Sequence, residues 1–292
     1  MQSLWMIFAS AMFAGMGVCV KLAAEAGYAP AKIVLVRSIV ALVIMSCIVR
    51  WRRVPLATPH WKLQLNRGVI GFCSLTVYFY AITLLPLATA VTLNYSSPVF
   101  LMLLLMTFRG LRPNGGLVLA MGCGFAGVAL MLHPTFAADA WFGGSMALAS
   151  ALLAAMTYFD VRELGLRGEP ETRTVFYFAV ISTLLAIVWI ILAPATDAPL
   201  TLPGFCLLAG VGVFATLAQL AMTRAYARGN VLLTASLAYS TVVFSTLFAI
   251  AFWNDRLDTL EILGMALIIL SGIATRWFSG GVRKARPGGK NG

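Results

Sequence analysis

The stretch LNYSSPVFLMLL, residues 93–104, returns as LAYSTVVFSTLF at residues 237–248, and six of its twelve positions are identical. The two copies lie 144 residues apart, and each places polar side chains inside a long apolar run. Apolar runs that are interrupted twice by the same polar residues indicate an internal duplication. The fold class therefore depends on what the apolar runs are and on how the two copies are related.

Composition places the chain in a membrane. Hydrophobic residues make up 61% of the 292 residues and charged residues 11%, and the mean hydropathy is +0.91. One soluble core cannot hide that much apolar surface, so we expect an all-α integral membrane protein. A bilayer crossing needs roughly 20 mostly apolar residues. Ten runs fit: 2–23, 30–49, 67–85, 88–108, 114–132, 142–163, 174–193, 203–226, 230–252 and 258–278. The short connectors leave no room for a soluble domain.

Other residue types argue against metal, cofactor and nucleotide chemistry. Five cysteines are scattered through apolar runs without C-x-x-C spacing, and His60 and His133 lie far apart in predicted loops. We expect the cysteines to serve as small hydrophobic residues, and we expect neither a metal nor a cofactor to bind. The chain also has no G-x-x-x-x-G-K-[ST] phosphate loop, which argues against a motor driven by its own ATP hydrolysis.

The net charge of +11 is distributed unevenly. If the N-terminus is inside, the inner loops and the tail hold sixteen basic residues, whereas the outer side holds Lys32 and Arg256. The sixteen are Arg50, Arg52, Arg53, Lys62, Arg67, Arg109, Arg112, Arg162, Arg167, Arg173, Arg228, Arg276, Arg283, Lys284, Arg286 and Lys290. Cytoplasmic loops are enriched in Lys and Arg, so both termini are predicted to be cytoplasmic. The basic tail, residues 280–292, is expected to be disordered near anionic lipid rather than bound to nucleic acid.

The two motif copies fall in the fourth and the ninth predicted spans. Because each half would hold five spans, an odd number, the halves must enter the membrane in opposite orientations. A second pair of segments, ASAMFAGM from Ala9 and ASALLAAM from Ala149, shares five of eight residues at an offset of 140. Chance similarity between Ala- and Leu-rich helices is the alternative. We therefore predict inverted five-helix repeats at residues 1–133 and 142–279, around a central cavity, as in alternating-access carriers.

The chain also resembles a known family. The run YFYAITLLPLATAVTLNYSSPVF from Tyr78, its counterpart TRAYARGNVLLTASLAYSTVVF from Thr223, and Gly-rich fifth and tenth spans are similar to the EamA-type branch of the drug/metabolite transporter superfamily. The resemblance implies ten helices around a central cavity and a peripheral last helix in each half that often contacts another protomer. It also implies amino acids, related metabolites, riboflavin, S-adenosylmethionine or small drugs as substrates. The segment FRGLRP departs from the family because it lacks the acid of a Gly-Glu-Arg-like turn, which NDRLD keeps through Asp255 and Arg256.

Polar residues of the two motifs are the first candidates for substrate binding. Asn94, Ser97 and Pro98 share a helical face by their spacing, and Pro98 disfavours the hydrogen bond to the Asn94 carbonyl. In the second copy, Tyr239 and Ser240 reach a comparable depth, but Val242 replaces Pro98, so the kink need not be duplicated. Intramembrane polar clusters either bind ligand or tie helices together, and both interpretations stay open.

Charged and aromatic residues inside the spans supply the other candidates. Arg37 lies about 10 Å below the outer surface, at 1.5 Å per residue, with no evident carboxylate partner. It either ties helix ends through carbonyl oxygens or accepts a substrate carboxylate.

Asp160 is a candidate proton carrier, with a structural ion pair to Arg162 or Arg224 as the alternative. Tyr80 and Tyr158 lie on elements that line the cavity in the resembling family, although packing is the alternative for each.

These observations predict a transporter of a small amphipathic metabolite, working by alternating access in the inner membrane, and not an enzyme. Export of amino acids or related metabolites is the main hypothesis. Uptake of a larger metabolite, such as S-adenosylmethionine or riboflavin, is the alternative. A membrane-embedded enzyme or scaffold is the alternative from a different class, but the histidines and acids form no interfacial constellation. A homodimer through the peripheral helices is expected as well.

Overall fold

The computed structural model describes residues 1–85, 87–133, 141–192, 199, 201–253, 258–278 and 283–284. Nearly all described residues are helical. The elements are η1 (Gln2–Leu4), α1 (Trp5–Glu25), α2 (Pro30–Trp51), α3 (Trp61–Leu84), α4 (Leu87–Asn94), α5 (Ser97–Arg109), β1 (Leu111–Arg112), α6 (Gly115–Leu132), α7 (Trp141–Leu166), α8 (Glu171–Leu192), α9 (Leu202–Arg228), α10 (Val231–Leu237), α11 (Ser240–Trp253), α12 (Thr259–Phe278) and β2 (Arg283–Lys284).

The expected all-α membrane fold is confirmed. Within the described chain, nine helical segments are long and apolar enough to cross a bilayer, and each coincides with a predicted span. The remaining predicted span, 67–85, falls on α3, whose 24 residues exceed the length that a crossing needs. That helix begins at Trp61, six residues before the predicted start, so Arg67 belongs to a helix. Arg67, which the sequence placed at the first residue of this span and counted among the inner basic residues, therefore lies inside α3 rather than at its start.

The fourth and ninth spans are each divided at the repeated motif. In the first copy α4 ends at Asn94 and α5 begins at Ser97, and in the second copy α10 ends at Leu237 and α11 begins at Ser240. The break is thus present in both copies although Val242 replaces Pro98, an outcome that the sequence had left open.

Shared residues explain why both spans break. Ser96 Oγ donates to the Leu93 carbonyl over 2.6 Å, and Ser240 Oγ donates to the Leu237 carbonyl over 2.6 Å. Backbone bonds between residues three apart also tighten the chain, with Ser96 N bonded to Leu93 O and Tyr239 N bonded to Ser236 O. Such local bonds compete with the regular helical pattern and bend a helix.

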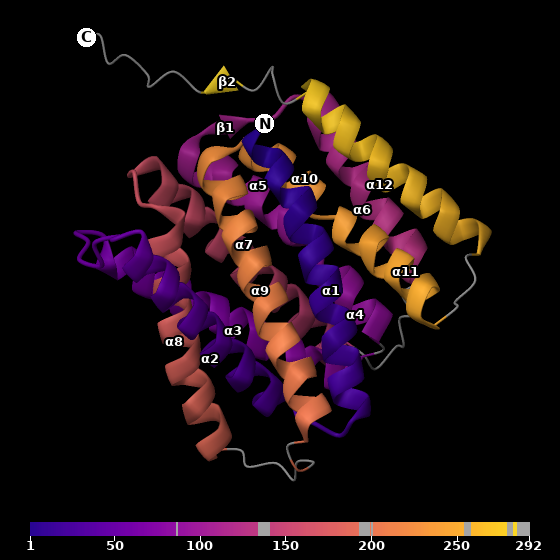
Figure 1. Cartoon of the computed structure of the whole chain (residues 1–292). Helices are drawn as coiled ribbons and strands as arrows, with labels where there is room; N and C mark the ends of the chain where they lie inside the picture. The colour runs from indigo at the N-terminus through magenta and orange to yellow at the C-terminus, as the bar shows by residue number, and fades with distance from the viewer. Residues whose placement is uncertain are drawn as a thin grey trace.

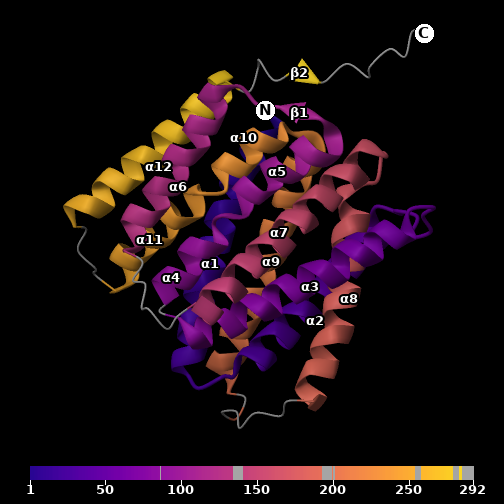
Figure 2. The same cartoon turned by 180° about the vertical axis from the view of Figure 1, so that it is seen from behind.

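The two halves of the chain interleave. The first helix of each half packs on the third major helix of the other half, as α1 on α9 and α7 on α3. The second helices, α2 and α8, pack on each other, and so do the last helices, α6 and α12. Figures 1 and 2 show α6 and α12 side by side at one edge of the bundle. Contacts that repeat when the halves are exchanged are what two inverted repeats produce.

Glycines bring α6 and α12 close together. A Cβ atom added at Gly127 would lie 2.7 Å from the carbonyl oxygen of Gly264, and one added at Gly264 would lie 2.6 Å from the carbonyl oxygen of Gly127. Small residues at helix contacts let backbones approach in this way inside membranes. The glycine-rich faces of these two helices are thus used within the protomer.

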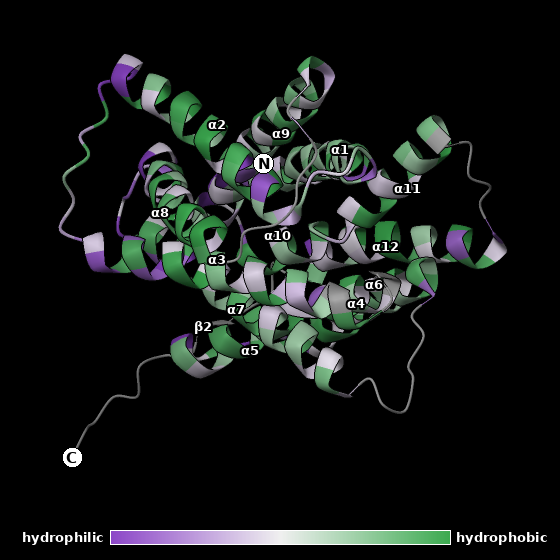
Figure 3. Ribbon diagram, turned by 90° about the horizontal axis from the view of Figure 1, so that it is seen from below, coloured by the Kyte–Doolittle hydropathy of each residue, from purple (hydrophilic) through white to green (hydrophobic). Residues whose placement is uncertain are grey.

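The outside of the bundle is apolar, as contact with lipid requires. Large side chains exposed on it include Ile39, Val43, Leu184, Ile191 and Ile273. Figure 3 shows that apolar residues make up most of each helix. A soluble protein would rarely expose such continuous apolar surface.

One short sheet stands at the end of the bundle that carries the N-terminus. Leu111 pairs with Lys284 and Arg112 with Arg283 in an antiparallel arrangement (Figure 1). The other residues of the predicted tail, 280–282 and 285–292, lie outside the described residues, and so do Asp255, Arg256 and residues 134–140 of the predicted outer loop.

Candidate functional site

A hollow lies where three helices from different halves meet. It is lined by Arg37 and Ser38 of α2, by Phe178 and Ser182 of α8, and by Thr216 and Gln219 of α9, among others. Its cavity volume is about 20 Å³. In this conformation the hollow has room for ordered water rather than for a metabolite.

Arg37 reaches this hollow from α2 and is half-buried. No hydrogen bond or ion pair joins its guanidinium to any residue in the described part of the chain. The interpretation in which Arg37 ties helix ends through carbonyl oxygens therefore finds no such contact in the described residues.

Arg67 lies beside the same hollow and is only 1% exposed. Its Nη2 donates to Gln219 Oε1 over 3.1 Å, and its guanidinium carbon stands 4.0 Å from the centre of the Phe178 ring. Both Gln219 and Phe178 line the hollow. Arg67 is thus a second arginine at this contact between the halves, and unlike Arg37 it is fully buried.

Asp160 of α7 is 7% exposed and has an amide as its partner. Asn66 Nδ2 donates to Asp160 Oδ2 over 2.7 Å. The expected ion pairs with Arg162 or Arg224 are absent among the described contacts, because Arg162 donates to the carbonyls of Ala227 and Gly229, and Arg224 donates to Gln2.

Asn94 and Ser97 lie at the break in the first motif. Asn94 Nδ2 donates to Ser150 Oγ of α7 over 2.8 Å, while Ser74 Oγ of α3 donates to the Ser150 carbonyl. Ser97, the first residue of α5, is 6% exposed. The first motif therefore contacts a helix of the other half.

Tyr239 and Ser240 lie at the break in the second motif, but their surroundings are different. Tyr239 is fully buried in an apolar cluster with Val128, Val242 and Ile268, and its hydroxyl has no partner among the described residues. The Tyr239 ring lies 6.3 Å from the ring of Tyr95, its equivalent in the first motif. This ring contact brings the two breaks together.

Two tyrosines outside the motifs differ in burial. Tyr158 of α7 stacks on Tyr226 of α9 with ring centres 4.7 Å apart and planes 10° apart. Tyr80 of α3 is 51% exposed, so the structure does not bury it with the other candidates.

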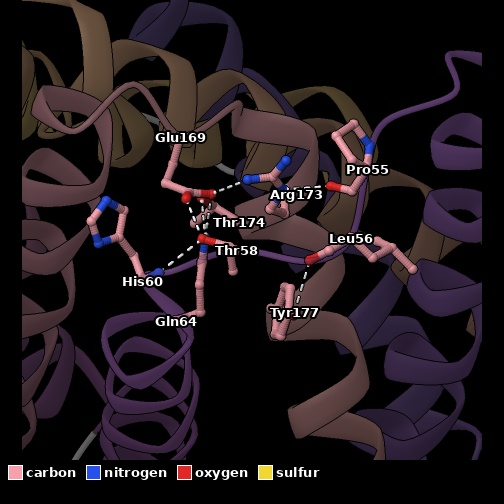
Figure 4. Close-up of polar contacts among 9 residues, drawn as sticks. All are labelled: Pro55, Leu56, Thr58, His60, Gln64, Glu169, Arg173, Thr174 and Tyr177. Atoms are coloured by element: carbon pink, nitrogen blue, oxygen red, sulfur yellow. Dashed lines mark hydrogen bonds and ion pairs between the residues drawn. The ribbon is translucent and has the colours of Figure 1, made fainter.

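A polar cluster ties the halves at one end of the bundle (Figure 4). Its centre is Glu169, in the turn before α8, which accepts hydrogen bonds from Thr58, Gln64 and Arg173. Arg173 Nε also donates to the Pro55 carbonyl over 2.7 Å. The Glu169 cluster thus fixes the turn before α8 to the connection between α2 and α3.

A second contact joins the halves at this end. Arg109, the last residue of α5, forms an ion pair with Glu163 of α7. The two contacts involve different helices of each half, so the halves are joined at two separate points at this end.

Residues missed at the sequence level are of two kinds. Ser96 is identical to Ser240 in the two motifs, so the alignment of the copies contained the signal. Arg67 and Gln219 had no such signal, because Arg67 follows Lys62, Gln64 and Asn66 in a stretch that is typical of a loop. Arg67 and Gln219 are 152 residues apart in the chain, so their contact depends on how α3 and α9 are placed in the folded protein.

Comparison with known proteins gives a consistent result. The chain matches the EamA-like transporter family over residues 1–133 and 141–276. It is 31% identical over 272 residues to the pseudopaline exporter CntI of Pseudomonas aeruginosa, covering 92% of this chain and 93% of that protein. It is 24% identical over 228 residues to the riboflavin transporter of Brucella anthropi, covering 74% and 80%. A solved crystal structure has the same fold, with a TM-score of 0.84, 20% identity and coverage of 96% of this chain and 98% of the other.

Proposed function

The chain belongs to the EamA-like transporter family, and from that premise we propose that it exports a small amphipathic metabolite, an amino acid or a close relative, by alternating access. The observation that carries this proposal is the similarity, over nearly the full length of both chains, to a protein named as an exporter. Membership of a transporter family also means that the chain is not an enzyme.

The contact between the halves supports alternating access. In inverted-repeat carriers one half rocks against the other around a fixed site. The hollow lies at such a contact, because Arg37 and Ser38 come from the first half whereas Phe178 and Gln219 come from the second. Movement of α2 away from α8 and α9 would enlarge it.

The end of the bundle at which these contacts join the halves indicates which conformation of the transport cycle the structure represents. The Glu169 cluster and the Arg109–Glu163 pair both join the halves at the same end of the bundle. By the distribution of basic residues this end is cytoplasmic. We therefore propose that this conformation is closed toward the cytoplasm, and that an exporter must break these contacts to load its substrate.

The residues singled out in the sequence are proposed to act at different stages of the transport cycle. Arg37, Tyr80, Asn94, Ser97, Tyr158, Tyr239 and Ser240 are the proposed substrate contacts. Asp160 is proposed for proton coupling, since a buried carboxyl held by the Asn66 amide can change its protonation without breaking an ion pair.

Uptake of a larger metabolite is the second candidate. Similarity to a protein named as a riboflavin transporter supports it, although at lower identity and coverage. A homodimer is also proposed, through the outer face of α12, where Ile262, Leu263, Ile269 and Ile273 are exposed.

Topology can be tested separately from transport. In a cysteine-free background, a cysteine at Ala137 should react with an impermeant maleimide in whole cells, and one at Gly288 should react only after lysis. Both positions lie outside the described residues, so the test depends on the sequence alone. The reverse labelling would place both termini outside and would overturn the proposed closed side.

The transport proposal is tested with the purified protein in proteoliposomes. Labelled amino acids, their amides, riboflavin and S-adenosylmethionine would be assayed with and without an imposed pH gradient. We expect saturable flux of an amino acid or a related solute. In cells, overproduction should raise the external concentration of the same solute. Flux of riboflavin or S-adenosylmethionine alone, with accumulation inside cells, would instead support the uptake alternative.

A further inference from the structure

Arg67 is a buried charge whose hydrogen-bonding capacity is largely unused. A guanidinium has five N–H groups, and within the described residues Arg67 has one hydrogen bond, from Nη2 to Gln219. Its Nε and Nη1 atoms are buried without partners in this part of the chain. An unpaired buried charge is costly, so an arginine retained in this way needs a partner from elsewhere.

The Phe178 ring defines which part of Arg67 is free. The guanidinium carbon lies 4.0 Å from the ring centre, a distance that is typical of a cation–π contact. Such a contact occupies a face of the guanidinium and leaves its N–H groups available. Gln219 then holds Nη2 at the wall of the hollow.

The charged residues near Arg67 carry a net positive charge, which favours binding of an anion. Arg37 and Arg67 are close enough to interact electrostatically, and Asp160 is the acidic residue that attracts Arg67. No ion pair joins Asp160 to either arginine among the described contacts, and its carboxylate accepts a hydrogen bond from the Asn66 amide instead. Two arginines and one aspartate leave one positive charge uncompensated. Ser182 Oγ, which is buried at the hollow without a partner, adds a neutral donor.

We propose that Arg67 and Arg37, with Gln219 and Ser182, form a binding site for the carboxylate group of the transported solute. The site lies between α2 and α3 of the first half and α8 and α9 of the second. The carboxylate would supply the missing hydrogen bonds of Arg67 and the missing negative charge. This inference rests on the proposed function, because it names the substrate class of that transporter.

Arg224 provides a matched control. It also bonds a glutamine, from Nε to Gln2 Oε1 over 3.0 Å, and it lies 4.9 Å from the centre of the Trp5 ring. Unlike Arg67, which contacts Gln219 and Phe178 at the wall of the hollow, Arg224 has Gln2 and Trp5 as its partners, and neither of them lines the hollow. A change at Arg224 therefore removes a similar set of contacts without removing a donor from the proposed site.

The test compares each carboxylate with its neutral amide, which has nearly the same size and shape. The thermal midpoint of the full-length protein in lipid nanodiscs would be titrated with N-acetyl-L-leucine, N-acetyl-L-methionine and benzoate, and with the amide of each, at fixed ionic strength. At least one carboxylate should stabilise the wild type and Arg224→Gln more than its amide does. In Arg67→Gln the half-saturating concentration should rise about tenfold or more, because a charge-assisted hydrogen bond is lost. Arg67→Lys keeps the charge with fewer donors and should fall between the two.

The outcomes separate this site from transport itself. If no carboxylate stabilises the wild type more than its amide, or if Arg67→Gln and Arg67→Lys both bind like the wild type, the carboxylate site is wrong. That result leaves the exporter proposal standing if a neutral or cationic solute is transported. Carboxylate binding that depends on Arg67, without flux of any solute, would instead support the site and contradict the transport proposal.

Discussion

The two copies of the motif, residues 93–98 and 237–242, break their helices in the same way but in different surroundings. Both have the Ser–Leu hydrogen bond, and their tyrosines contact each other. Asn94 and Pro98 of the first copy are replaced by Ala238 and Val242 in the second. Because the break persists without a proline, the shared Leu-x-Tyr-Ser residues account for it. Asn94 is an addition that connects the first copy alone to Ser150 of α7.

The largest expected effect comes from the tyrosines, which are identical in sequence but not in burial. Tyr239→Ala should cost about 3–5 kcal/mol, as truncation of a buried aromatic residue does, because this ring is fully buried. Tyr95→Ala should cost less, since Tyr95 is half-buried. Denaturant unfolding in detergent micelles, followed by tryptophan fluorescence, would measure both. Equal losses would mean that the two breaks are equally packed.

Asn94→Ala places in the first copy the residue that the second copy has at the equivalent position, Ala238. Loss of the hydrogen bond to Ser150 should lower stability by about 1 kcal/mol. Ser150→Ala removes the acceptor instead and is the matched control. If Asn94 also contacts substrate, as proposed, Asn94→Ala and Asn94→Leu should reduce the initial rate of transport in proteoliposomes well below that of Ser150→Ala. Equal rates in all three variants would leave Asn94 with a packing role alone.

The serines should behave alike in both copies. Ser96→Ala and Ser240→Ala each remove one local hydrogen bond to a leucine carbonyl, and each should cost about 0.5–1 kcal/mol in the same unfolding assay. The two breaks are equivalent only if both variants lose the same amount of stability. A much larger loss in one variant would show that its break depends on that serine and the other break does not.

Pro98→Val should have the smallest effect, about 0.5 kcal/mol or less. Pro98 lies in the first turn of α5, where a missing N–H is tolerated. The distance between spin labels on α4 and α5 should stay as in the wild type. A change in that distance would assign the first break to the proline and end the equivalence of the two copies.

The sequence predicted what depends on long apolar runs and on internal similarity. Nine spans, the membrane fold and the family are confirmed, because each follows from patterns over twenty or more residues. The start of α3 could not be predicted in this way. Its polar residues Gln64 and Arg67 look like loop residues until their partners, Glu169 and Gln219, are known to lie beside them.

The site residues show the same difference between what a local sequence pattern reveals and what depends on contacts between distant helices. Arg37 was recognisable because a charge in an apolar run stands out. Arg67 was not, because its burial is created by helices of the other half. Ser96 is a different case, since the aligned motifs pair it with Ser240, which was among the candidates, while Ser96 itself was not.

The interleaving of the halves has a consequence for how the protein is made. The first half of the chain enters the membrane before α7, α8 and α9 exist, yet these are the helices on which α3, α2 and α1 pack. Residues 1–133 therefore cannot complete their packing during their own synthesis. Until the second half arrives, Arg67 has neither Gln219 nor Phe178 beside it. A chain truncated after α6 should be recognised by membrane quality control and degraded, and the second half supplied as a separate polypeptide should rescue it.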